Sequence, residues 1–251
     1  MKILIFGGTT EGRELSAALA KAGADVTVSV ASGYGAEEQD KGFGIRIEEG
    51  PKTEDEMRLL IKDADICVDA THPYAVVVSE TIRKAAHAEG IEPVRLKREQ
   101  AETEEQVLSA EDSEDAARIA AEKGGRVLLT TGSKDLQTYA EAIDPELLFP
   151  RVLPLHGSIG SCERAGIPHR NIIAVQGPFS EDFNRAVIDE YDIDLLVTKE
   201  SGKAGGFAEK IRACKSRGIP AIVIARPADD GLSYEDVLGL CMKRINGEIE
   251  S

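Results

Sequence analysis

A glycine-rich turn near the N-terminus is the feature of this sequence with the clearest chemical meaning. It reads Gly7-Gly8-Thr9-Thr10-Glu11-Gly12, follows a short apolar run directly and precedes a helical pattern. Glycines between a strand and a helix let the backbone approach a pyrophosphate, and the N–H groups of the helix N-terminus can bind its oxygens. We therefore predict that the whole turn binds a dinucleotide, through Gly7, Gly8, Thr9, Thr10, Glu11 and Gly12.

Two other interpretations of this turn have to be weighed. Its spacing almost matches an ATP-binding P-loop, but that motif continues with Lys and Ser or Thr, whereas this chain continues with Arg13 and Glu14. We exclude an NTPase on those two residues. The middle glycine of the dinucleotide motif is replaced by Thr9, so a tight turn without a ligand stays an alternative.

The sequence does not decide between NADH and NADPH. In dinucleotide-binding folds an acid at the end of the second strand binds the ribose 2′-hydroxyl, and an arginine tolerates a 2′-phosphate. That strand ends here in Ser29-Val30-Ala31-Ser32, which contains neither. The missing carboxylate favours NADP, and Ser32 is expected to contact the cofactor.

A second candidate loop, Thr71-His72-Pro73-Tyr74, follows the fourth apolar run. Ligands of α/β proteins gather at the carboxyl ends of the strands, and His and Tyr side chains can transfer protons. We predict that His72 and Tyr74 are catalytic and that Thr71, His72 and Pro73 contact the cofactor. A purely structural role for His72 is the alternative.

The second half of the chain offers residues that could bind an anionic substrate. Two loops, Thr130–Lys134 and Thr198–Gly206, combine hydroxyls, lysines and glycines after apolar runs, and such loops form anion sites. Arg151 lies inside an apolar run, where a charge requires a partner or a ligand. The predicted substrate-binding residues are Arg13, Gly132, Ser133, Lys134, Arg151, Lys199, Glu200, Ser201 and Gly202.

The elements that must position these residues alternate along the whole chain. Short runs rich in Ile, Val and Leu predict strands buried on both faces, and helical patterns separate them, which is typical of a parallel sheet in an α/β protein. The expected strands are 3–6, 26–30, 45–47, 66–69, 94–96, 127–130, 147–153, 172–175, 195–198 and 221–225.

One acidic stretch interrupts this rhythm and suggests a domain boundary. Residues 99–117 contain eight acidic side chains and no basic ones, and Asp112 is suited to cap a following helix. We predict a dinucleotide-binding domain over 1–98, an acidic junction over 99–117 and a second Rossmann-like domain over 118–251.

Composition limits the classes of partner. The 251 residues carry a formal net charge of −15 and no Trp, which argues against a nucleic-acid-binding or basic membrane-surface protein. The four cysteines form no C-x-x-C pair, and the N-terminal apolar run is too short for a signal peptide. We expect a cytoplasmic protein without a bound metal; the oligomeric state is open.

At these motifs the chain resembles the precorrin-6A reductase family of corrin biosynthesis, including its cobalt-precorrin-6A branch. The resemblance rests on five stretches in one order: ILIFGGTTEGREL, DATHPYA, VLLTTGSKDL, QGPFS and LLVTKESGKAGG. The closing PAIVIARP also fits, whereas Leu96-Lys97-Arg98-Glu99 stands where the family has Arg-Pro-Pro-Trp or similar.

The resemblance implies two Rossmann-like domains with a cleft between them. It also implies hydride transfer from NADPH or NADH to a conjugated double bond of a polycarboxylate tetrapyrrole, with any cobalt carried by the substrate. Two alternatives stay open: a two-domain tetrapyrrole cyclase of the uroporphyrinogen-III synthase type, which needs no nucleotide, and a dinucleotide-sensing module without catalysis.

Overall fold

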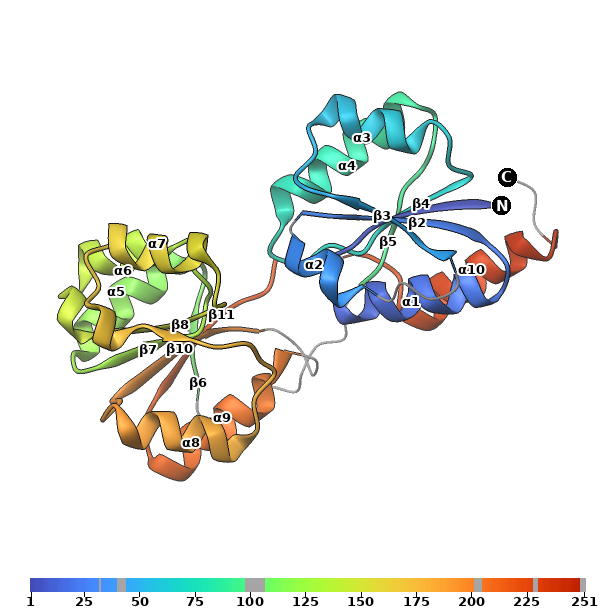
Figure 1. Ribbon diagram of the computed structural model, residues 1–251. Coiled ribbons are helices and arrows are strands. Elements are labelled where there is room, and N and C mark those ends of the chain that lie inside the picture. Colours follow the sequence, from blue (N-terminus) through green and yellow to red (C-terminus); the bar gives the residue numbers. More distant parts are fainter. Residues whose placement is uncertain (32, 40–43, 98–106, 201–204, 228–229, 249–251) are drawn as a thin grey trace. The chain divides into compact units, whose positions relative to one another are not determined.

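The computed structural model describes residues 1–31, 33–39, 44–97, 107–200, 205–227 and 230–248. The chain folds into two compact units, each with its own parallel sheet (Figure 1). Unit 1 comprises residues 1–98 and 227–251, and unit 2 comprises residues 99–226. The expected α/β class with two Rossmann-like parallel sheets is confirmed, and the cleft between the units stays a prediction.

The sheet of unit 1 has five strands in the order β3-β2-β1-β4-β5, all parallel. The strand order reverses between β1 and β4. In open parallel sheets, ligands bind at such a switch point, outside the carboxyl ends of the two strands. The strands are β1 (Lys2–Phe6), β2 (Asp25–Val30), β3 (Arg46–Glu49), β4 (Ile66–Asp69) and β5 (Val94–Arg95). The helices are α1 (Thr10–Lys21), α2 (Gly33–Glu38), α3 (Glu54–Ile61), α4 (Val76–Ala88) and α10 (Tyr234–Ile245).

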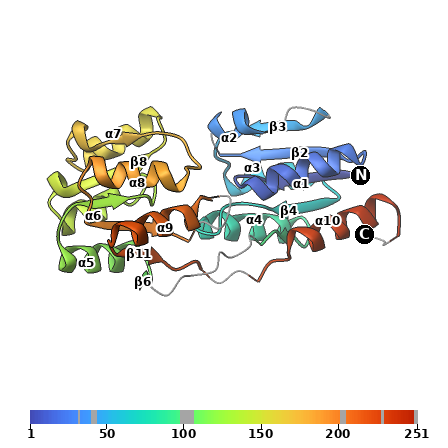
Figure 2. The ribbon, with the colours of Figure 1, turned by 90° about the horizontal axis from the view of Figure 1, so that it is seen from below.

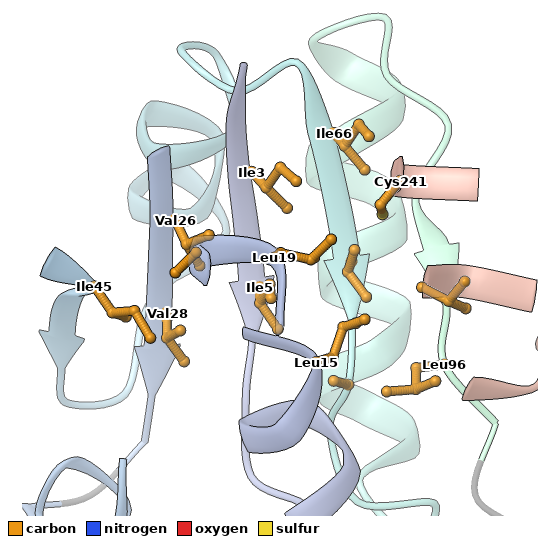
Figure 3. Packing of buried hydrophobic residues seen from close by; sticks show 14 of the residues in the cluster. Ile3, Ile5, Leu15, Leu19, Val26, Val28, Ile45, Ile66, Leu96 and Cys241 are labelled. Atoms are coloured by element: carbon orange, nitrogen blue, oxygen red, sulfur yellow. The ribbon is translucent and has the colours of Figure 1, made fainter. Parts of the chain in front are cut away.

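Alternation along β1 distributes its side chains between two cores. Ile3 and Ile5 belong to the cluster that α1 and α10 cover (Figure 3). Leu4 and Phe6 belong to the cluster under α3 and α4. Because successive side chains of a strand point to opposite faces, a continuous apolar run fills both layers. Both faces of this sheet are therefore buried, as the run predicted.

The C-terminal segment belongs to unit 1, so the predicted domain over 118–251 is wrong in its last part. Val237 and Cys241 are fully buried in the core cluster that contains Leu15 and Leu19 of α1. Figure 3 shows Cys241, Leu15 and Leu19 in this cluster, and α10 lies alongside α1 (Figures 1 and 2). The chain before α10 also joins the sheet, because Leu232 N–H donates to Arg95 O at 2.9 Å. Apolar burial on α1 and this parallel pairing explain the return.

Unit 2 has six parallel strands in the order β6-β11-β10-β7-β8-β9. These are β6 (Val107–Ala110), β7 (Val127–Leu129), β8 (Leu148–Val152), β9 (Ile173–Ala174), β10 (Leu195–Lys199) and β11 (Ala221–Ile224). The α-helices are α5 (Ser113–Lys123), α6 (Leu136–Ala142), α7 (His156–Arg164), α8 (Glu181–Glu190) and α9 (Phe207–Arg217). One core cluster joins α8 and α9 to the sheet.

The acidic stretch is not simply a junction, which corrects the second domain prediction. Residues 107–110 form β6, which pairs with β11, and α5 begins at Ser113. Asp112 caps this helix as expected, with its Oδ1 accepting from Asp115 N–H at 2.8 Å. The other ten strands agree with the predicted ones to within two residues.

Candidate functional site

The glycine-rich turn joins β1 to α1 as predicted, and its glycines have different structural reasons. Gly7 N–H donates to Ser29 O of β2 at 2.8 Å, and a Cβ on Gly7 would come within 3.0 Å of Val28 Cγ1. A Cβ on Gly12 would come within 2.9 Å of Ala70 Cβ. Close packing against the end of β4 therefore requires glycine at position 12, and close packing against β2 favours it at position 7.

Thr9 is buried and caps α1. Its Oγ1 accepts from Gly12 N–H at 3.1 Å and donates to Ala70 O at 3.0 Å. The predicted cofactor residues Thr9 and Gly12 therefore offer no side-chain group to a ligand, and they fix the turn against the chain that leads into Thr71. The two predicted loops thus meet at the carboxyl ends of β1 and β4.

Gly8 is the open point of the turn. Its φ is +143°, and a Cβ built there would meet no atom within 4 Å. A positive φ favours glycine, so any side chain at Gly8 would strain the turn as well as occupy this space. Thr10 and Arg13, on the first turns of α1, are bonded to each other, with Arg13 Nη2 3.1 Å from Thr10 Oγ1.

A buried polar network shapes the loop after β4. Asp69 Oδ1 accepts from Thr71 N–H at 3.0 Å and from Thr71 Oγ1 at 2.6 Å, and it lies 2.9 Å from Arg95 Nη1. Arg95 also donates to Thr71 O at 3.1 Å, and Thr71 Oγ1 lies 3.1 Å from Ser79 Oγ. Thr71 is therefore held by β5 and α4, and its hydroxyl serves this network.

His72 and Tyr74 lie half-buried next to this network. Their rings are stacked, with centroids 5.5 Å apart and planes inclined by 28°. Tyr74 N–H points at His72 Nδ1 at 3.5 Å; where Nδ1 accepts this bond, the neutral ring carries its proton on Nε2. Pro73 is buried and lines a cavity of about 390 Å³ with Asp69, Ser79 and Arg95.

In unit 2, Lys199 is an ion-paired residue rather than an isolated cation. Its Nζ lies 3.0 Å from Asp135 Oδ2, which also accepts from Ser113 Oγ at 2.9 Å. Partial burial would raise the pKa of Asp135, but the hydrogen bond and charge of Lys199 outweigh it and hold that pKa below its usual value. The pair joins β10 to the loop after β7.

Arg151 lies near the end of β8, where its guanidinium contacts an aromatic ring and a side-chain amide. Its guanidinium lies 4.7 Å from the centroid of the Phe179 ring, and its Nη1 donates to Asn184 Oδ1 at 2.8 Å. Among the described residues, no carboxylate forms an ion pair with it. Burial lowers the pKa of Arg151 to about 10, so it stays charged at neutral pH.

The remaining predicted substrate residues are dispersed over the loops of unit 2. Gly132 has a φ of +89° and Lys134 is exposed, while Ser133 Oγ lies 3.5 Å from Ser158 Oγ. Glu200 is largely buried, with its Oε1 4.0 Å from Arg226 Nη2. Ser32, Ser201 and Gly202 lie outside the described residues.

Sequence reasoning missed the side chains that position these loops. Asp69 is the last residue of β4 and lies two residues before the predicted loop, so an acid ending an otherwise apolar run was the available signal. Phe179 and Asn184 lie far from Arg151 in sequence, and no local pattern connects them. The motif QGPFS contained Phe179 without indicating its contact.

Metal-binding clusters and membrane-spanning helices are both absent from the described residues. No group of three or more His, Cys, Asp or Glu side chains is placed to hold a metal ion within those residues. None of the helices among them has the length and apolarity to span a membrane.

Comparisons with known proteins connect this arrangement to one family. The model of the family "Precorrin-6x reductase CbiJ/CobK" matches residues 2–242. The chain is 38% identical over 231 residues to the cobalt-precorrin-6A reductase of Priestia megaterium, covering 90% of each chain. It is 34% identical over 230 residues to the precorrin-6A reductase of Rhodococcus erythropolis, covering 90% of this chain and 89% of that one.

A solved structure agrees on the fold. The structure titled "CobK precorrin-6A reductase" superimposes with a TM-score of 0.75 at 23% identity, covering 96% of each chain. The match of the family model over almost the whole chain, together with relatives above 30% identity, confirms the resemblance on the five motifs. This chain belongs to the precorrin-6x reductase family.

Proposed function

We propose that this protein reduces a conjugated carbon–carbon double bond of precorrin-6A or cobalt-precorrin-6A with NADH or NADPH, giving the 6B form in cobalamin biosynthesis. The relatives named for this reaction cover nine tenths of the chain. The observation that carries the proposal is the open turn at Gly8, beside the reversal of strand order between β1 and β4.

The residues of this turn fit a dinucleotide. Gly8 leaves space where a side chain would stand, and Thr9 and Gly12 hold the start of α1 against the end of β4. The first N–H groups of a helix have no partner within the helix and attract phosphate oxygens. We assign the pyrophosphate to the Gly7–Gly12 turn and the nicotinamide end to the loop of Thr71, His72 and Pro73.

Reduction of a double bond adds a hydride and a proton. The nicotinamide, when bound, supplies the hydride, so this chain has to orient the reactants and deliver the proton. His72 and Tyr74 are the proposed donors, since both rings lie half-buried at the end of β4 and His titrates near neutral pH. The buried contacts among Asp69, Thr71 and Arg95 would hold that loop in place.

Binding of a polycarboxylate by an acidic protein requires a local positive charge. Arg151 is the strongest candidate for this positive charge, because its described partners are an aromatic ring and an amide rather than an acid. The geometry weakens the case for Lys199, whose charge is balanced by Asp135. The other proposed substrate contacts are Arg13, Gly132, Ser133, Lys134, Glu200, Ser201 and Gly202; the cytoplasmic location also stays a prediction.

A visible-absorption assay tests the proposal. Purified protein is mixed with precorrin-6A, its cobalt form, and each nucleotide in turn, and the spectra of the ring and the nicotinamide are followed together. We expect the moles of ring reduced to equal the moles of nicotinamide oxidised. Binding of the nucleotide without turnover would support the sensing module instead. Unchanged spectra with every combination of substrate and nucleotide would overturn the proposed reductase activity.

Two variants of Gly8 separate backbone strain from blocked binding. Gly8→Ala and Gly8→Leu both force a side chain onto a φ of +143°, so they share most of the strain. The larger side chain alone would fill the space that a phosphate needs. We expect the nucleotide affinity, measured by calorimetry, to fall much further for Gly8→Leu. Equal affinities in folded variants would remove this turn from the binding site.

A further inference from the structure

Backbone pairing joins the ends of β2 and β3 at one edge of the sheet of unit 1. The two strands are parallel, and Val30 is paired in register with Glu49. Gly50 N–H donates to Val30 O at 2.9 Å, with Gly50 at a φ of +95°. Glu49 is therefore fixed beside the end of β2, although it lies far from it in sequence.

The Glu49 carboxylate reaches across to the chain that follows β2. A Cβ built on Gly33 would lie 2.8 Å from Glu49 Oε1, so the carboxylate rests where Gly33 has no side chain. The Glu49 side chain is exposed to solvent. An acidic group thus occupies the strand-end position at which the sequence of β2 itself offers none.

The Glu49 carboxylate is available to a ligand, because the nearest lysine along the chain bonds to backbone oxygens. Lys52, the nearest lysine along the chain, donates from Nζ to Glu49 O at 2.7 Å and to Gly50 O at 3.4 Å, so its bonds go to backbone carbonyls. Within the described part of the chain, no ion pair involves the Glu49 carboxylate. The strand end therefore presents a negative charge.

We propose that Glu49 is the residue that determines nucleotide selectivity, by accepting hydrogen bonds from the adenosine ribose and repelling a 2′-phosphate. The inference rests on the proposed nucleotide-dependent reduction. A carboxylate at the end of the second strand performs this task in dinucleotide-binding folds; here the third strand delivers it. The chain accordingly selects NADH over NADPH, against the preference that the sequence of β2 suggested.

Glu49→Gln tests the assignment with little change of shape. We expect the wild type to bind NADH more tightly than NADPH in calorimetry. The variant should lose about tenfold or more of this preference, since a hydrogen bond to a charged group is replaced by one to a neutral amide. The ratio of kcat/KM for the two nucleotides should move in the same direction, while thermal unfolding stays unchanged.

Glu48→Gln is the matched control. It removes the same charge from the adjacent residue, whose side chain points to the opposite face of the strand, and it should leave the preference unaltered. A preference unchanged by Glu49→Gln, changed equally by both variants, or favouring NADPH in the wild type would overturn the assignment. The calorimetric preference can be measured whether or not the ring is reduced, so these outcomes bear on the assignment of Glu49 alone. Failure of reduction with either nucleotide would instead refute the proposed function.

Discussion

Replacing Arg151 by Met should separate the cost of this charge to stability from its use in binding. Burial lowers the pKa of Arg151 to about 10, which shows that the surroundings oppose the charge without abolishing it at neutral pH. The substitution loses the stacking on Phe179, worth roughly 0.5–2 kcal/mol. It also removes the donor to Asn184 Oδ1, at roughly 1–3 kcal/mol, while the penalty for burying an unpaired charge disappears.

These contributions oppose each other, so the free energy of unfolding in urea should change by no more than about 2 kcal/mol. The affinity for the substrate should suffer more. Loss of a charge-assisted hydrogen bond to a substrate carboxylate costs roughly 1.5–3 kcal/mol, which raises KM about 10- to 100-fold. Calorimetry should give an unchanged nucleotide affinity, because the nucleotide residues belong to the other unit.

Arg118→Met provides the control. Arg118 lies on α5 of the same unit, is 60% exposed and pairs with Asp115 and Glu122, so it loses the same charge away from the proposed site. Its KM should stay within about twofold of the wild type, because the lost charge lies away from the proposed site. Its stability should also change little, because exposed ion pairs contribute little to the free energy of unfolding. Strong destabilisation of Arg151→Met together with an unchanged KM would show that Arg151 is structural and does not bind the substrate.

Three further predictions concern the proton donor, an ion pair and the thiols. His72→Asn keeps a hydrogen-bonding group without a titratable proton, so kcat should fall roughly 10²–10⁴-fold in a folded protein and the alkaline limb of its pH profile should flatten; a normal kcat and profile would exclude this donor. Against the effect of partial burial, Lys199 lowers the pKa of Asp135 in the folded protein. The ion pair therefore stabilises the fold fully above the unfolded-state pKa of about 3.9, and this effect is lost as the pH falls from there through the lower folded-state pKa. The difference in unfolding free energy between wild type and Asp135→Asn should therefore shrink on acidification, and a constant difference would contradict the pairing. Burial raises the pKa of Cys67 and Cys214 to about 12 and that of Cys241 to about 11, so these thiols should react with a disulfide reagent only after urea unfolds the protein; stoichiometric labelling of the native state at pH 8 would contradict their burial.

Most of the fold follows from patterns that are local in sequence. Runs such as Ile66–Asp69 are apolar without alternation, because both faces of the sheet are covered, and this made them recognisable as buried strands. The Gly7–Gly12 turn was equally clear, since the packing of Gly12 on Ala70 and the positive φ of Gly8 each require glycine. Local chemistry therefore predicted where the loops of the candidate site begin.

The parts that sequence reasoning missed depend on contacts between distant residues. β6 was hidden because Val107–Ala110 is short and flanked by acidic residues that cap and begin α5. The return of α10 depends on Val237 and Cys241 packing against α1, which no local pattern encodes. The same holds for Glu49, whose position beside Gly33 follows from the register of β3 with β2.

Deuterium transfer from the nucleotide to the ring distinguishes hydride transfer from any other source of the new hydrogen. The protein is incubated with precorrin-6A and NADH that carries deuterium at both hydrogens of nicotinamide C4, in ordinary water, and the product is analysed by mass spectrometry and NMR. The reduced ring should acquire one deuterium from the nucleotide and one hydrogen from the solvent. A reduced ring without deuterium would contradict hydride transfer from the nucleotide.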